Sequence, residues 1–76
     1  MNSVNIRLST IADVRDFVNI VSKSDVDIDL KSGRYVVDGK SIMGIFSLDL
    51  LSPITLRTEG PEADNLIAKL GNYIVD

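Results

Sequence analysis

Ser41 is the residue of this sequence best placed to do chemistry. It stands in the stretch Gly39–Leu48, after the turn signal Asp38-Gly39 and directly before a short apolar run. A small hydroxyl residue in that position is typical of a helix N-cap, and the backbone N–H groups at a helix N-terminus stabilise a phosphate. Two interpretations follow: a serine that can carry a phosphate, or an ordinary cap on a core helix. These residues alone favour the ordinary cap.

The segment after Ser41 carries more apolar surface than one buried face needs. A helix of about two turns buries a single stripe of side chains. Five apolar residues occur here, namely Ile42, Met43, Ile45, Phe46 and Leu48. We therefore expect part of this surface, including Met43 and Phe46, to face solvent beside Ser41. Lys40 would supply a cation next to a phosphate on Ser41.

The composition excludes several classes of site. With 76 residues, 45% of them apolar and 25% charged, the chain is expected to form one globular domain over residues 1–76. It contains no cysteine and no histidine. Their absence removes disulfides, thiolate chemistry, the commonest general base and metal ligand, and any phosphohistidine. We predict no catalytic residue, no metal site and no cofactor.

Three alternating aspartates, Asp25, Asp27 and Asp29, resemble the opening of a calcium-binding EF-hand loop. That loop needs a glycine at its sixth position and a bidentate glutamate at its twelfth. Leu30 and Val36 occupy those two positions here. The solvated face of a strand is therefore the better interpretation of the aspartates.

The charge pattern argues against nucleic acids and membranes. The net charge is −3, and the eight basic residues are scattered along the chain, whereas nucleic-acid binders cluster Lys and Arg against phosphates. No apolar run approaches the roughly 20 residues of a membrane span. Residues Met1–Thr10 lack the basic and apolar regions of a signal peptide. We expect a cytoplasmic protein.

Apolar periodicity predicts seven elements around Ser41. Four segments alternate in apolar character, which predicts strands, and two longer segments have helical spacing. Thr10 and Asp13 form a short capping box before the first of these helices. The predicted order is a strand at 4–8, a helix at Ile11–Ser22, strands at 26–30 and 35–37, the short helix after Ser41, a strand at 54–57, and a helix from Pro61 to Ile74.

The same periodicity predicts which side chains are buried. The first helix is expected to bury Ile11, Val14, Phe17, Val18 and Val21, and the last helix Leu66, Ile67 and Leu70. Ser32-Gly33 is expected to be the turn of a hairpin. Strands with one wet face and helices on the other side predict a two-layer α+β domain. A ferredoxin-like fold shares the first six elements, so the order alone leaves both folds open.

The serine segment decides between these folds through a resemblance. Lys40-Ser41-Ile42-Met43-Gly44, continued by Ser47-Leu48, resembles the regulatory serine segment of HPr, the small phosphocarrier of the bacterial sugar phosphotransferase system. The resemblance extends from Val4 to about Ile74 in spacing and pattern. It implies an open-faced β-sandwich of the order βαββαβα, with an antiparallel four-stranded sheet in strand order 1-4-2-3 and helices on one face.

The sequence departs from the family at the carrier site. HPr proteins have a phosphorylatable histidine in a G-[IL]-H-A-R-P pattern at the start of the first helix. Counting back from Ser41 without gaps puts Thr10 at the histidine position, with Leu8, Ala12 and Asp13 at the glycine, arginine and proline positions. Alanine cannot clamp a phosphate as a guanidinium does, and aspartate would repel it. The resemblance therefore implies a relative without phosphocarrier activity.

What the resemblance leaves is the regulatory role. In HPr the equivalent serine is phosphorylated by an ATP-dependent kinase, and the modified protein binds a transcriptional regulator of carbon catabolism. We therefore expect Ser41 to be a regulatory phosphorylation site on a protein that is not an enzyme. Expected partners are a serine kinase or phosphatase, and a transcriptional regulator or phosphotransferase-system components, which would contact Lys40, Ile42, Met43, Phe46 and Ser47. The alternative is an interaction domain with the same fold and no phosphorylation.

Overall fold

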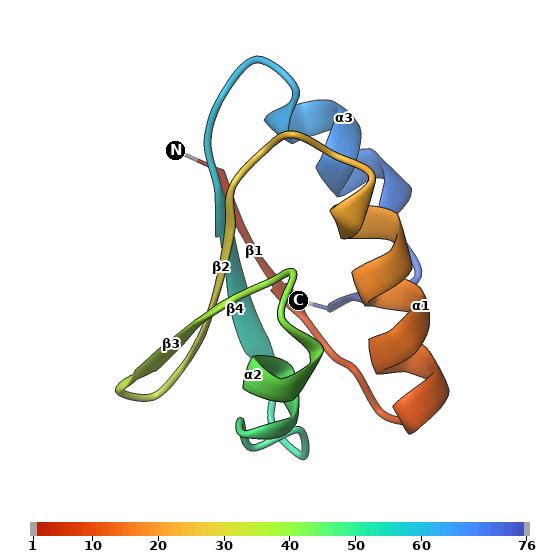
Figure 1. Cartoon of the computed structure of the whole chain (residues 1–76). Helices are drawn as coiled ribbons and strands as arrows, with labels where there is room; N and C mark the ends of the chain where they lie inside the picture. The colour runs from red at the N-terminus through yellow and green to blue at the C-terminus, as the bar shows by residue number, and fades with distance from the viewer. Residues whose placement is uncertain (1, 76) are drawn as a thin grey trace.

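The chain folds into a sheet with its helices on one face (Figure 1). The computed structural model describes residues 2–75, which form five strands and three helices. In chain order these are β1 Asn2–Ile6, α1 Ile11–Ser22, β2 Ile28–Ser32, β3 Tyr35–Asp38, α2 Ile42–Phe46, β4 Ile54–Thr58, α3 Ala63–Lys69 and β5 Ile74–Val75. This arrangement confirms the predicted α+β class, and α1 begins and ends at the predicted residues.

The sheet has one strand more than predicted. Its order is β3-β2-β4-β1-β5, and every neighbouring pair is antiparallel. The expected order 1-4-2-3 is present in the first four strands, but β5 adds to the outer side of β1, with Ile6 opposite Ile74. The predicted extension of the last helix to Ile74 is therefore wrong. Gly71 weakens that helix at its end, and the Tyr73 carbonyl instead accepts the Arg7 N–H at 2.8 Å.

One core lies between the sheet and the helices. Its fully buried side chains are Ile6, Leu8, Val14, Phe17, Val21, Ile28, Leu30, Ile45, Ile54, Leu56 and Leu70. Three predicted core residues are not in it: Ile11 is 76% exposed, and Val18 and Ile67 are half-buried. At 3.6 residues per turn, Ile11 lies roughly 90° and Ile67 roughly 70° from the centre of the buried stripe of its helix.

The hairpin between β2 and β3 turns one residue later than predicted. Ser32 pairs with Tyr35, so the two turn residues are Gly33 and Arg34. Gly33 has a φ of +61°, and a glycine with positive φ at the first turn position is typical of a type II′ hairpin turn. This turn ends at the outer strand of the sheet.

The packing of α3 predicts a clear difference between two adjacent residues. Leu66 is 3% exposed, whereas Ile67 is only half-buried. Leu66→Ala should cost about 2–5 kcal/mol of unfolding free energy and lower the melting temperature by about 10 °C or more. Ile67→Ala should have the smaller effect. Equal shifts in thermal unfolding would show that α3 is docked through a different face.

Candidate functional site

The structure places Ser41 as the N-cap of α2, as predicted. The Ser41 backbone is extended (φ −98°, ψ 106°), and its Oγ accepts the Gly44 N–H at 3.1 Å. The Ser41 side chain is half-buried. The backbone carbonyl of Ser41 accepts the Ile45 N–H at 3.0 Å, which is the first hydrogen bond inside the helix. The Ser41 hydroxyl therefore acts as an acceptor in the cap, which does not require the hydroxyl's own proton.

Gly44 lets α2 approach β3 closely at this point. A Cβ at Gly44 would lie 3.2 Å from Ser41 Oγ and 3.2 Å from the Val37 Cβ. Real side chains rarely pack as tightly as that, so glycine keeps both the cap and the contact between α2 and β3 unstrained. The glycine of the Lys40–Gly44 segment thus has a packing role that directly supports Ser41.

Lys40 and Ser47 use their polar groups inside the protein. The Lys40 ammonium donates to the Ser24 carbonyl at 2.7 Å, just beyond the end of α1. The Ser47 hydroxyl donates to the Gly44 carbonyl at 2.6 Å at the end of α2. The Lys40 contact therefore ties the residue before Ser41 to the segment after α1, whereas the Ser47 bond is local to the end of α2. The expectation that Lys40 would neutralise a phosphate on Ser41 does not match the contact it makes here.

Helix α2 carries an exposed apolar surface. Met43 is 76% exposed, Phe46 41% and Ile42 39%, whereas Ile45 is fully buried. The apolar residues of α2 thus divide between core and surface, as the sequence predicted. The exposed side chains stand on the same short helix that Ser41 begins.

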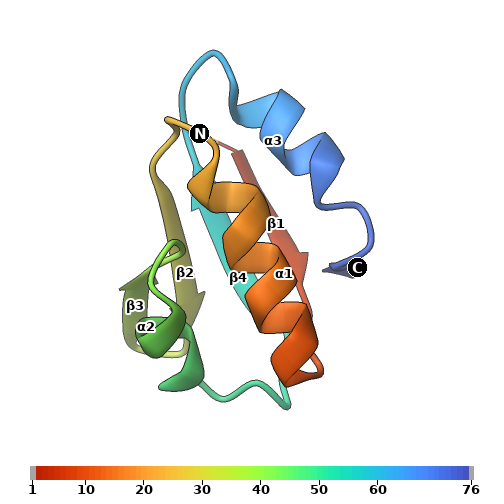
Figure 2. The ribbon, with the colours of Figure 1, turned by 45° about the vertical axis from the view of Figure 1, so that its right-hand side comes forward.

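Two further exposed apolar residues lie at the same end of the molecule as α2. The start of α1, helix α2 and the loop from α2 to β4 lie at the same end (Figures 1 and 2). Ile11 opens α1, Leu51 lies in that loop, and both are largely exposed. Their exposure was not predicted, because Ile11 has the spacing of a core residue and the loop carries no periodic pattern.

The carboxylate of Asp13 accepts the free backbone N–H groups at the start of α1. Thr10 Oγ1 accepts the Asp13 N–H at 3.0 Å. In return, Asp13 Oδ2 accepts the backbone N–H of Ser9 at 3.0 Å and of Thr10 at 3.3 Å. This confirms the predicted capping box. The N–H groups of Ser9 and Thr10, which could otherwise face an anion at the helix N-terminus, are engaged by Asp13.

The surroundings of this helix start are also negative. A hollow of about 390 Å³ beside it is lined by Arg7, Ser9, Asp13, Asp16, Asn72, Tyr73 and Val75. The pKa of the Tyr73 hydroxyl is raised, first by burial and then by the charges of Asp16 and Asp13. The Tyr73 ring also packs edge-to-face on Phe17, with centroids 6.0 Å apart. A second anion at this position would meet the two carboxylates.

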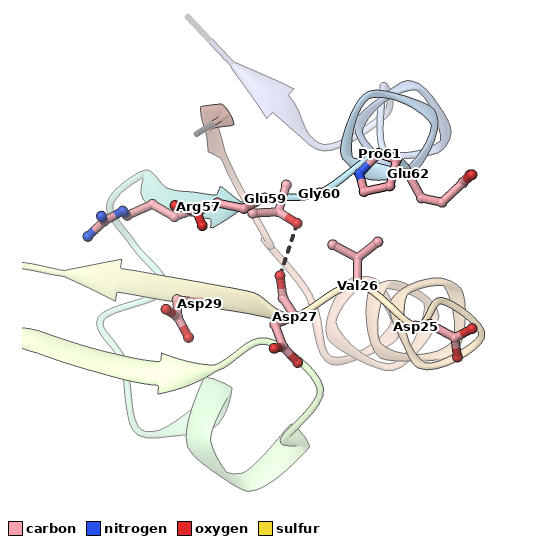
Figure 3. Close-up of a pocket in the computed structure, with 10 residues that line it drawn as sticks. Asp25, Val26, Asp27, Asp29, Arg57, Glu59, Gly60, Pro61 and Glu62 are labelled. Atoms are coloured by element: carbon pink, nitrogen blue, oxygen red, sulfur yellow. Dashed lines mark hydrogen bonds between the residues drawn. The ribbon is translucent and has the colours of Figure 1, made fainter.

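A separate hollow of about 530 Å³ lies near the junction of β2, β4 and α3 (Figure 3). Two of the residues that line it are joined by a hydrogen bond, in which the Thr58 hydroxyl donates to the Asp27 carbonyl at 2.9 Å. Figure 3 shows the side chains of Asp25, Asp27 and Asp29 spread apart rather than converging. Within residues 2–75, no group of His, Cys, Asp or Glu side chains is arranged to hold a metal ion.

The sequence and the fold both match those of known proteins. A family model described as the PTS HPr component phosphorylation site matches residues 13–76. The chain belongs to the HPr family. The predicted family membership is therefore confirmed, and the match includes Ser41 and all of α2.

Solved structures of HPr proteins agree. The protein described as HPr-C-His from Thermoanaerobacter tengcongensis is 29% identical to this chain and superposes on it with a TM-score of 0.81. The alignment covers 95% of this chain and 89% of the other chain. The phosphocarrier protein HPr from Bacillus anthracis is 30% identical, with coverages of 97% and 94% and a TM-score of 0.72. A search of curated proteins gave no match.

The catabolite repression containing protein Crh of Bacillus subtilis has the same fold. It is 24% identical, covers 92% of this chain and 79% of its own, and has a TM-score of 0.67. Proteins of the HPr family act as phosphocarriers and interact with other proteins of the phosphotransferase system and with regulators. Among residues 2–75, no helix has both the length and the apolar character that crossing a membrane requires.

Proposed function

We propose that this HPr-family protein has a regulatory, protein-binding role and no phosphohistidine carrier activity. Ser41 is the phosphorylation site, and the exposed residues of α2 form the surface that partners recognise. The observation that carries the proposal is the combination of a capping serine and an exposed Met43 on one short helix inside the matched segment. The partners are proteins, namely a serine kinase or phosphatase and a regulator of carbon catabolism or phosphotransferase-system components.

Two observations support the loss of the carrier role. The sequence contains no histidine, so no phosphoimidazole can form. Thr10, which the gap-free count from Ser41 puts at the histidine position, has its hydroxyl in the capping box with Asp13. A phosphothreonine ester is a poor phosphoryl donor, and the Asp13 carboxylate already accepts from the local N–H groups.

The geometry of Ser41 is compatible with phosphorylation by ATP. The hydroxyl oxygen would attack the γ-phosphorus, the bond from that phosphorus to the β,γ-bridging oxygen would break, and ADP would leave while the hydroxyl proton passes to a base on the kinase. The modification adds about −1.5 to −2 charges beside the exposed side chains of α2. A charge next to an apolar surface changes what that surface can bind.

The structural neighbour Crh is described as a catabolite repression protein. That description supports a partner that regulates carbon catabolism. The alternative is an interaction domain that binds through α2 without phosphorylation. The two differ in one measurable property. Regulator binding would require phosphate on Ser41 in the first case and would not depend on it in the second.

Met43 provides the test of the binding surface. We expect Met43→Ala to weaken binding of the Ser41-phosphorylated protein to a purified HPr-responsive catabolite regulator by about tenfold or more, because exposed apolar anchors dominate such interfaces. Isothermal titration calorimetry measures the affinity. The matched control is Val36→Ala, which truncates an exposed apolar side chain on β3 and should leave the affinity unchanged. Equal losses in both variants would contradict a surface centred on α2.

A further inference from the structure

Met43 carries the sulfur atom of this chain that an oxidant can reach at the surface of α2. The sequence contains no cysteine and no tryptophan, and its two methionines are Met1 and Met43. A thioether is a soft nucleophile that peroxides oxidise, whereas aliphatic side chains do not react with them. Met43 is 76% exposed, so a dissolved peroxide reaches its sulfur without any opening of the fold.

The fold of α2 does not depend on the Met43 side chain. The helix is fixed to the core by Ile45, which is fully buried, and its start is capped by the hydrogen bond from the Gly44 N–H to Ser41 Oγ. Met43 is not among the side chains of the core or those packed against it. Oxidation of a buried methionine disrupts a core, but an oxygen added to Met43 stays in water and leaves the packing of α2 unchanged.

The polarity of Met43 matters to the exposed surface of α2. Met43 exposes a larger fraction of its side chain than either Ile42 or Phe46, the other exposed apolar residues of the helix. Oxidation converts its flexible apolar side chain into a polar one that accepts hydrogen bonds. A partner that covers the sulfoxide must supply a donor or leave a polar group buried without one, which is unfavourable. One added oxygen atom therefore changes what this surface can bind.

We propose that Met43 is a reversible oxidation site whose sulfoxide switches the surface of α2 from apolar to polar. The effect on partner binding rests on the proposed function of that surface, whereas the oxidation itself does not. Phosphate on Ser41 and oxygen on Met43 then act on the same short helix, two residues apart. The first modification adds charge and the second removes an apolar contact, so an oxidant lowers partner binding even when Ser41 is phosphorylated.

The co-reactant is a hydroperoxide such as hydrogen peroxide. The Met43 sulfur attacks one peroxide oxygen, and the S–O bond forms as the O–O bond breaks. The departing hydroxide takes the proton from the transferred oxygen and becomes water, so the sulfur loses two electrons and the peroxide gains them. For the reduction, two thiols return the sulfoxide to the thioether and yield a disulfide and water. Methionine sulfoxide reductases catalyse this second step.

Mass spectrometry of tryptic peptides locates the added oxygen. Trypsin separates the two methionines, because Met1 lies in peptide 1–7 and Met43 in peptide 41–57. Mild treatment of the full chain with hydrogen peroxide should add one oxygen atom to peptide 41–57, and methionine sulfoxide reductases with dithiothreitol should remove it. The treated protein should melt within about 3 °C of the untreated protein. A peptide 41–57 that gains no oxygen or keeps it after reduction, or a treated protein that is unfolded, overturns the proposal.

Hydrophobic-interaction chromatography of the native protein tests the change in the surface without any partner. The oxidised protein should elute earlier than the untreated protein, because α2 has become more polar. Met43→Leu keeps an apolar side chain at this position but has no sulfur there, so peroxide should shift its elution far less. Equal shifts in the two proteins would assign the change to Met1 and contradict a switch at Met43.

Calorimetry with the regulator connects the switch to partner binding. With Ser41 phosphorylated and the peroxide removed before mixing, the oxidised protein should bind a purified HPr-responsive catabolite regulator about tenfold more weakly than the untreated protein. Met43→Leu should bind it equally before and after treatment. An unchanged affinity of the oxidised protein, or the same loss in Met43→Leu, overturns the switch. A regulator that does not bind even the untreated protein contradicts the proposed function alone, and the elution shift then decides the effect of oxidation on α2.

Discussion

Phe17→Ala is expected to lower the melting temperature by about 15 °C or more. Phe17 is fully buried at the centre of α1, and removing such a side chain costs about 3–5 kcal/mol. The edge-to-face contact with Tyr73 adds about 0.5–1.5 kcal/mol. A chain of 76 residues has a total stability of about 4–11 kcal/mol, so the substitution removes a large part of it.

Denaturant unfolding followed by circular dichroism measures this loss. The neighbouring Val18→Ala serves as a control, because Val18 is only half-buried on the same helix. It should lower the midpoint far less than Phe17→Ala. If Phe17→Ala melted within about 2 °C of the original protein, the placement of α1 on the sheet would be wrong.

Incubation with enzyme I and phosphoenolpyruvate is expected to leave the protein unlabelled. The carrier reaction of the family needs a histidine, and the sequence has none. Acid-labile, base-stable label on the protein would refute this expectation. A histidine-containing HPr treated in the same reaction is the positive control.

Restoring the histidine alone should not restore the reaction. Thr10→His should accept phosphate weakly at best, since Asp13 still occupies the N–H groups of Ser9 and Thr10 and Ala12 provides no guanidinium. Adding Ala12→Arg and Asp13→Pro to Thr10→His should raise transfer well above that of Thr10→His alone. Rapid transfer by Thr10→His alone would show that the Asp13 carboxylate does not obstruct the site.

Features set by neighbouring residues were predictable from the sequence. The limits of α1, the Thr10–Asp13 capping box and the Ser41 cap depend on contacts within four residues, and all three match the structure. The exposure of Met43 and Phe46 was also predictable, because a short helix buries only one stripe. Each of these predictions rests on local geometry.

Features set by distant segments were not predictable in this way. β5 forms because the chain after Gly71 returns to pair with β1, and a helical period that continues to Ile74 conceals that change. The Lys40 ammonium bonds to Ser24, sixteen residues away in the chain, so its role as a tether could not be read from its place beside Ser41. Ile11 has the spacing of a core residue but lies too far round α1 to reach the sheet.

Mass spectrometry of the intact protein after incubation with an HPr kinase and ATP tests the central proposal most directly. The protein should gain the mass of one phosphoryl group. Ser41→Ala should gain no phosphoryl group. This variant should still fold, because it loses only a helix cap worth about 1 kcal/mol. Ser47→Ala, which removes the other hydroxyl of the α2 segment, should be modified like the original protein. An unchanged mass of the original protein, or a phosphoryl group retained in Ser41→Ala, would contradict a regulatory role for Ser41.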